Sequence, residues 1–79
     1  MTPTATLREP RLEAIEAITG LSRDARRILY QLAEEVAHFE RRTDQVPMSI
    51  RACAQEDFQL ALQMFELAVK AAGGHYHEG

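Results

Sequence analysis

Residues 49–72 read SIRACAQEDFQLALQMFELAVKAA, and they form the most apolar stretch of the chain. At about 100° per residue, the apolar side chains of this stretch make two neighbouring stripes on a helix, where an ordinary surface helix has one. The first stripe contains Phe58, Ala61, Leu62, Phe65, Val69 and Ala72. The second contains Leu60, Met64, Leu67 and Ala71, which we predict to be an oligomer interface. Such a helix has to be covered from two directions, and a second copy of the chain is the natural cover.

The length of the chain also favours an oligomer. Seventy-nine residues make one domain at most, and a chain of this size buries only about 60% of its unfolded surface. The single cysteine cannot form an internal disulfide, and there is no paired Cys/His spacing for structural zinc. No segment has the apolar core of a signal peptide or the ~18 apolar residues of a membrane span. We therefore expect a soluble, cytoplasmic homo-oligomer with no membrane partner.

Capping and breaking residues predict an all-α fold in a single helical domain, residues 1–79. A short N-terminal helix over about 10–19 starts at Pro10 and stops at Gly20. A long antiparallel helical hairpin follows, with helices over about 22–42 and 50–72, and we expect it to assemble into a homo-oligomeric bundle. Ser22 and Ser49 are the predicted N-caps, and the break between the long helices is TDQVP, residues 43–47. Residues 1–8 and 73–79 are expected to be flexible. The core stripe of the middle helix is Ala25, Ile28, Leu29, Leu32, Val36 and Phe39.

Arginines gather where the middle helix begins. Eight of the nine basic residues are arginine, although the net charge of −3 argues against binding of bulk nucleic acid. Arginine suits bidentate recognition of phosphate, and a tyrosine one turn away can stack on a base. The predicted anion or nucleotide site consists of Arg23, Arg26, Arg27, Tyr30 and Arg51. Arg26 and Tyr30 are its central pair, and a neighbouring protomer supplies Arg51 or its own Arg23. The alternative is that these arginines form solvated salt bridges with nearby glutamates.

Other patterns that could carry chemistry are weaker. Glu35 and His38 have the i, i+3 spacing of carboxylate-bridged di-metal bundles, but their helix phase is unfavourable. His75 and His77 could bind a transition metal, but we expect a solvated tail. Cys53 is predicted to be a small buried residue, since it falls on the apolar arc. There is no GxSxG, P-loop, GxGxxG or HExxH motif. We therefore predict no catalytic residue, no metal, no cofactor and no enzyme activity.

The order of these features resembles the helical-hairpin domain of phage anti-CBASS and anti-Thoeris sponges, which sequester cyclic nucleotide immune signals. The residues that carry the resemblance are Arg27, Leu32-Ala33, Pro47, Ser49, Arg51, Leu60-Ala61, Phe65-Glu66 and Ala68. The chain departs from the family pattern at Ile50, which separates the serine from the arginine, at Phe65 in place of leucine, and in having no tryptophan. The resemblance implies a compact homo-oligomer with small nucleotide pockets between protomers and no catalysis.

Three functions remain open from the sequence. The first is a non-enzymatic oligomeric sponge that sequesters cyclic nucleotides. The second is a helical adaptor or regulator that binds a host protein. The third is a di-metal-binding helical oligomer.

Overall fold

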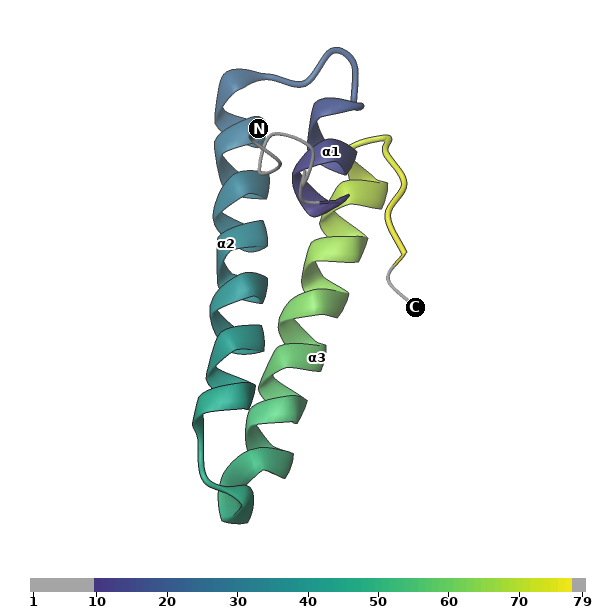
Figure 1. Ribbon diagram of the computed structural model, residues 1–79. Helices are drawn as coiled ribbons and strands as arrows, with labels where there is room; N and C mark the ends of the chain where they lie inside the picture. Colours follow the sequence, from purple (N-terminus) through teal and green to yellow (C-terminus); the bar gives the residue numbers. More distant parts are fainter. Residues whose placement is uncertain (1–9, 78–79) are drawn as a thin grey trace, which may run out of the picture.

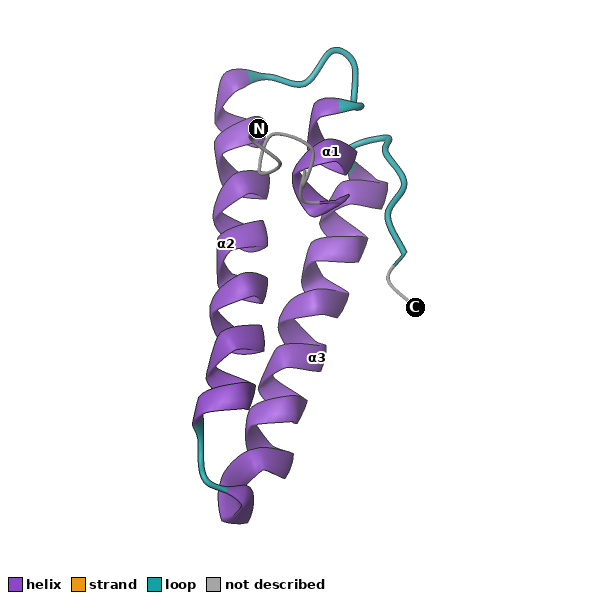
Figure 2. Ribbon diagram, viewed as in Figure 1, coloured by secondary structure: helices purple, strands orange, loops and turns teal. Residues whose placement is uncertain are grey.

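A computed structural model describes residues 10–77 and shows three helices (Figures 1 and 2). They are α1 (Pro10–Glu16), α2 (Arg23–Gln45) and α3 (Met48–Ala71). Helices α2 and α3 form a long antiparallel hairpin, and α1 lies beside its open end, near the C-terminal turns of α3 (Figure 1). Residues 10–77 contain no strand, so the predicted all-helical architecture is confirmed, whereas the assembly into an oligomer stays a prediction. No helix in this part of the chain has the length and apolarity that crossing a membrane requires.

The connection between α2 and α3 is shorter than the sequence suggested. Helix α2 continues through Gln45, and the hydroxyl of Thr43 donates to the carbonyl oxygen of Phe39 at 2.9 Å. Val46 then turns to extended backbone, as expected for the residue before Pro47. The prediction that Ser49 caps α3 is wrong, because Pro47 holds the cap position and makes no side-chain cap hydrogen bond. The predicted cap of α2 is confirmed, since the Ser22 hydroxyl oxygen accepts from the Ala25 backbone N–H at 3.1 Å.

The core lies along the line where α2 and α3 meet and continues under α1. Phe65 is fully buried at the centre, together with Val36 of α2 and Ile15 of α1. The buried core consists of Ile15, Ile18, Leu29, Ala33, Val36, Leu62, Phe65 and Val69. The first apolar stripe of residues 49–72 therefore faces α2, as its helical phase predicts. Ile28 was assigned to the core stripe of α2, but it is 54% exposed because it lies at the edge of that stripe.

One buried charge connects α1 to the hairpin. The guanidinium of Arg11 is almost fully buried, and both of its terminal nitrogens donate to the same Glu40 carboxylate oxygen at 3.3 Å. A buried arginine is tolerated only where a carboxylate or other acceptors satisfy it. Helix α1 has seven residues, so this ion pair and the contacts of Ile15 set its place on the hairpin.

The second stripe of α3 faces away from α2. Leu60 is 60% exposed, Met64 59% and Leu67 67%, and Ala71 is exposed as well. Cys53 is also exposed, so the prediction of a buried thiol is wrong. Its place on the helix is seven residues, two turns, before Leu60, and it therefore shares the direction of the second stripe.

The C-terminal residues that the structure describes fold back along α3. Gly73 takes a positive φ of 94°, which only glycine adopts without strain, and it ends the helix. The backbone N–H of Gly74 then donates to the Val69 carbonyl at 2.9 Å. The ring of Tyr76 packs edge-on against Phe65, with centroids 5.4 Å apart. Tyr76 of the predicted flexible tail thus packs against the core, whereas residues 1–8 and 78–79, also predicted to be flexible, lie outside the described part.

We expect Phe65→Ala to lower the free energy of unfolding by about 3–5 kcal/mol, because it removes the fully buried ring at the meeting point of all three helices. Urea denaturation followed by circular dichroism measures the change. Gln31→Ala on the exposed side of α2 is the control and should change the free energy by less than about 0.5 kcal/mol. Equal stability of the two variants would contradict the burial of Phe65 in the core.

Candidate functional site

The predicted arginine cluster stands at the beginning of α2. Arg23, Arg26 and Arg27 are all exposed there. The terminal nitrogen Nη2 of Arg27 lies 3.7 Å from the Asp24 carboxylate, a pair that solvent surrounds on both sides. Within residues 10–77, the guanidinium groups of Arg23 and Arg26 have no hydrogen-bonded or ion-pair partner. These two groups are therefore available to an anion.

Tyr30 differs from these arginines because it is anchored. Its side chain is half-buried and packs against the hydrophobic core, while Arg26 lies one turn earlier on the same side of α2. A ring held in place by core contacts loses little rotamer freedom when a ligand binds. Arg26 and Tyr30 therefore stand one helical turn apart on the same side of α2, the first exposed and the second held against the core.

Arg51 lies far from this cluster within one protomer. It is in the first turn of α3, at the closed end of the hairpin, whereas Arg26 is at the open end (Figure 1). Its terminal nitrogen Nη2 donates to the Val46 carbonyl at 3.1 Å and so stabilises the turn between α2 and α3. At about 1.5 Å per residue the hairpin separates the two ends by roughly 30 Å. Arg51 can join the arginine cluster only from another protomer.

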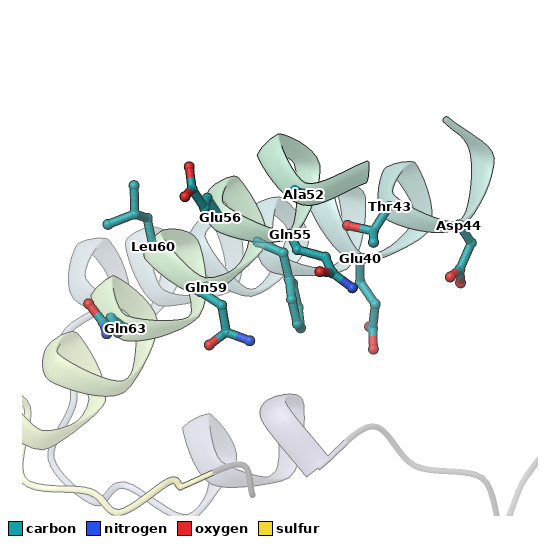
Figure 3. A pocket seen from close by; sticks show the side chains of 10 residues that line it. Glu40, Thr43, Asp44, Ala52, Gln55, Glu56, Gln59, Leu60 and Gln63 are labelled. Atoms are coloured by element: carbon teal, nitrogen blue, oxygen red, sulfur yellow. The ribbon is translucent and has the colours of Figure 1, made fainter. Parts of the chain in front are cut away.

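A hollow lined by carboxylates and amides lies on the surface of residues 10–77, and it was not predicted from the sequence. Its open volume is about 770 Å³, and it lies near the closed end of the hairpin. Figure 3 shows Glu40 and Gln59 projecting from one side of the hairpin, whereas Leu60 and Glu56 project the opposite way. The lining residues are Glu40, Thr43, Asp44, Ala52, Gln55, Glu56, Phe58, Gln59, Leu60 and Gln63. The Glu40 carboxylate of this lining already accepts from the buried Arg11 guanidinium, so its charge is compensated within the protomer. The i, i+4 row of Gln55, Gln59 and Gln63 was the only sequence signal for it.

A smaller hollow lies between the end of α3 and residues 74–77. Its volume is about 350 Å³, and Glu66 and His77 line it together with Lys70 and Tyr76. The imidazole Nδ1 of His77 is 3.9 Å from the Glu66 carboxylate. Residues 10–77 contain no group of three or more potential metal-binding side chains. Glu35 and His38 of the predicted di-metal motif are both exposed on α2, where the His38 ring packs edge-on against Phe39.

The exposed stripe of α3, formed by Leu60, Met64 and Leu67, is another candidate interaction surface. Large apolar side chains scattered singly over a surface are ordinary, but a contiguous row of them marks an interaction site. Leu60, Met64 and Leu67 are successive members of one such row, each more than half exposed. They are the residues assigned to an oligomer interface from the sequence.

We expect Arg51→Ala to lower the free energy of unfolding by about 1–3 kcal/mol, because it removes the charged donor to the Val46 carbonyl in the hairpin turn. Thermal unfolding measures the loss, and Arg41→Ala on exposed α2 surface is the control. A destabilised Arg51→Ala protein with normal ligand affinity would assign Arg51 to the turn. Unchanged stability with weaker binding would instead assign it to a ligand site between protomers.

Comparison with known proteins returns no similarity: no family model matches the chain, and no curated protein or solved structure is significantly similar to it. The arginine cluster and the exposed stripe of α3 are the surface features of the described residues that point to a binding function. The stripe and the cluster lie on separate parts of the protomer, so one can hold an assembly together while the other contacts a ligand.

Proposed function

We propose that this chain is a non-enzymatic helical binding protein that acts as an oligomer assembled through α3. The observation that carries the proposal is the row of Leu60, Met64 and Leu67, which are 59–67% exposed in the protomer. Full burial of such a side chain contributes about 1.5–3 kcal/mol. Small domains have only about 5–15 kcal/mol of stability in total, so covering the row changes the stability of a chain of this size substantially.

The ligand that we propose is a cyclic nucleotide, bound in the manner of the sponge proteins that the sequence resembles. Arg26 supplies a guanidinium for a phosphate, and the anchored ring of Tyr30 supplies a stacking surface for a base. Arg23 and Arg27 add positive potential at the N-terminus of α2, where the helix dipole also favours an anion. Arg51 of a neighbouring protomer completes the proposed site. Sequestration requires only binding, so no catalytic group enters the proposal.

The alternative is an adaptor that binds a host protein. The same exposed row of α3 supports it, because an amphipathic helix of a partner can cover an apolar stripe as well as a second copy can. The two functions differ in composition of the assembly: a sponge consists of this chain and nucleotide, whereas an adaptor contains a second kind of chain.

We expect Leu67→Glu to dissociate the oligomer while the protomer keeps its helices, because a carboxylate in the covered row has no partner there. Sedimentation velocity at micromolar concentration measures the assembly, and circular dichroism checks the fold. The control is Gln31→Glu, which adds the same charge on exposed α2 surface. A folded wild-type protein that sediments as a monomer would refute assembly through α3.

We expect wild-type protein to bind one member of a panel of cyclic di- and trinucleotides and cyclic ADP-ribose variants. Arg26→Ala should weaken that binding about ten- to hundredfold, since a charge-assisted contact is worth about 1.5–3 kcal/mol. Isothermal titration calorimetry measures both affinities, and Arg41→Ala is the matched control, an exposed arginine farther along α2. No heat with any member of the panel, or equal affinity of Arg26→Ala and wild type, would exclude the nucleotide and leave the adaptor function.

A further inference from the structure

The exposed side chains of α3 follow a heptad repeat that extends beyond the predicted interface. Alternating steps of three and four residues, the spacing of a coiled-coil seam, connect successive positions along the helix. The series is Ile50, Cys53, Asp57, Leu60, Met64, Leu67 and Ala71, and every member is exposed. The first apolar stripe faces α2, so this seam is a second, separate packing surface of the same helix.

We infer that α3 pairs with α3 of a second copy of this chain, and that the two helices run antiparallel. This inference rests on the proposed assembly through α3 and names its partner, direction and register. The flanks of the seam decide the direction, because in a coiled coil the flanking residues of one helix meet those of the other.

One flank of the seam is self-complementary in charge. It carries Glu56, Gln63 and Lys70 at heptad spacing, all of them exposed. In an antiparallel pair this flank meets the same flank of the second copy, so Lys70 of each copy lies beside Glu56 of the other, and the two Gln63 side chains meet at the two-fold axis. Within residues 10–77 of one protomer, neither Glu56 nor Lys70 has an ion-pair partner. A surface that is complementary to itself is what a two-fold homodimer requires.

The other flank lets the helices approach closely. It consists of Ala61 and Ala68, small half-buried side chains that border the core of the protomer, while Ala54 at the same heptad position is already buried within the protomer. Alanine at these positions leaves room for a second helix without displacing the α2–α3 contact.

Asp57 is the one charged member of the seam, and it argues against the parallel arrangement. In a parallel pair the two Asp57 carboxylates face each other in one layer and repel. In the antiparallel register given by the Glu56–Lys70 pairs, Leu60 is level with Met64 of the second copy and Cys53 with Ala71. The two Asp57 residues are then about 15 Å apart along the axis at about 1.5 Å per residue. Each one lies near Lys70 of the other copy instead.

The cysteine of the chain tests direction and register directly. Cys53 is the single cysteine and it is exposed. In the antiparallel pair the two Cys53 thiols are about 27 Å apart along the axis, so wild-type protein should not form a disulfide. Ala71→Cys places a second thiol level with Cys53 of the other copy, and mild oxidation should convert most of the protein to a covalent dimer. The control is Ala71→Cys combined with Cys53→Ser. It should run as a monomer on a non-reducing gel, because its two introduced thiols lie too far apart to form a disulfide.

The outcomes separate this inference from the proposed function. A covalent dimer that forms in Ala71→Cys, but not in the wild type or in the control variant, supports the antiparallel register. Rapid disulfide formation in the wild type would show that Cys53 meets Cys53, which overturns the antiparallel pairing while assembly through α3 stands. A monomer in sedimentation velocity would overturn both. A heteromeric complex that forms only with a different chain would also overturn the inference.

Charge reversal provides a second measurement that does not depend on cysteine chemistry. Lys70→Glu and Glu56→Lys should each weaken the dimer about three- to tenfold, because each replaces two attractive pairs by two repulsive ones. The double variant restores both pairs with their signs exchanged, so its dimer affinity should return toward that of the wild type. Additive loss in the double variant would contradict the Glu56–Lys70 contact.

Discussion

The packing of Phe65 and Val69 against Leu29 and Val36 is the contact on which the rest of the structure depends. All four side chains lie in the buried core between α2 and α3. Helix α1 is too short to form a core by itself, and its Ile15 packs into the core that α2 and α3 share. The stability of this protomer therefore comes mainly from one strip of contact between two helices, which is little apolar burial for a folded chain.

That strip uses only one of the two apolar faces of α3, and the other face is exposed on the protomer. A helix packed on one side normally exposes polar residues on the other. Helix α3 instead exposes Leu60, Met64 and Leu67. Nothing in the hairpin requires these residues to be large and apolar, and the proposed contact with another chain would account for them.

Charges of both signs lie at each end of the hairpin. Arg23, Arg26 and Arg27 stand with Asp24 where α2 begins, and Arg41, Arg42 and Arg51 stand near the carboxylates of the closed end. In an antiparallel assembly the ends of different protomers come together, and Arg51 and Lys70 are the basic residues that such an arrangement moves toward new neighbours.

The three helices, the Ser22 cap and the choice of Phe65, Leu62 and Val69 for the core could be predicted from the sequence, because caps and helical periodicity depend on residues a few positions apart. The exposure of Cys53 was mispredicted because its place on the apolar arc was taken as burial, although its spacing of seven residues from Leu60 puts it on the exposed stripe. The role of Arg51 in the hairpin turn, the hollow near the closed end and the docking of Tyr76 on Phe65 needed the tertiary structure. Each depends on segments distant in sequence meeting at a particular angle, which local patterns do not encode.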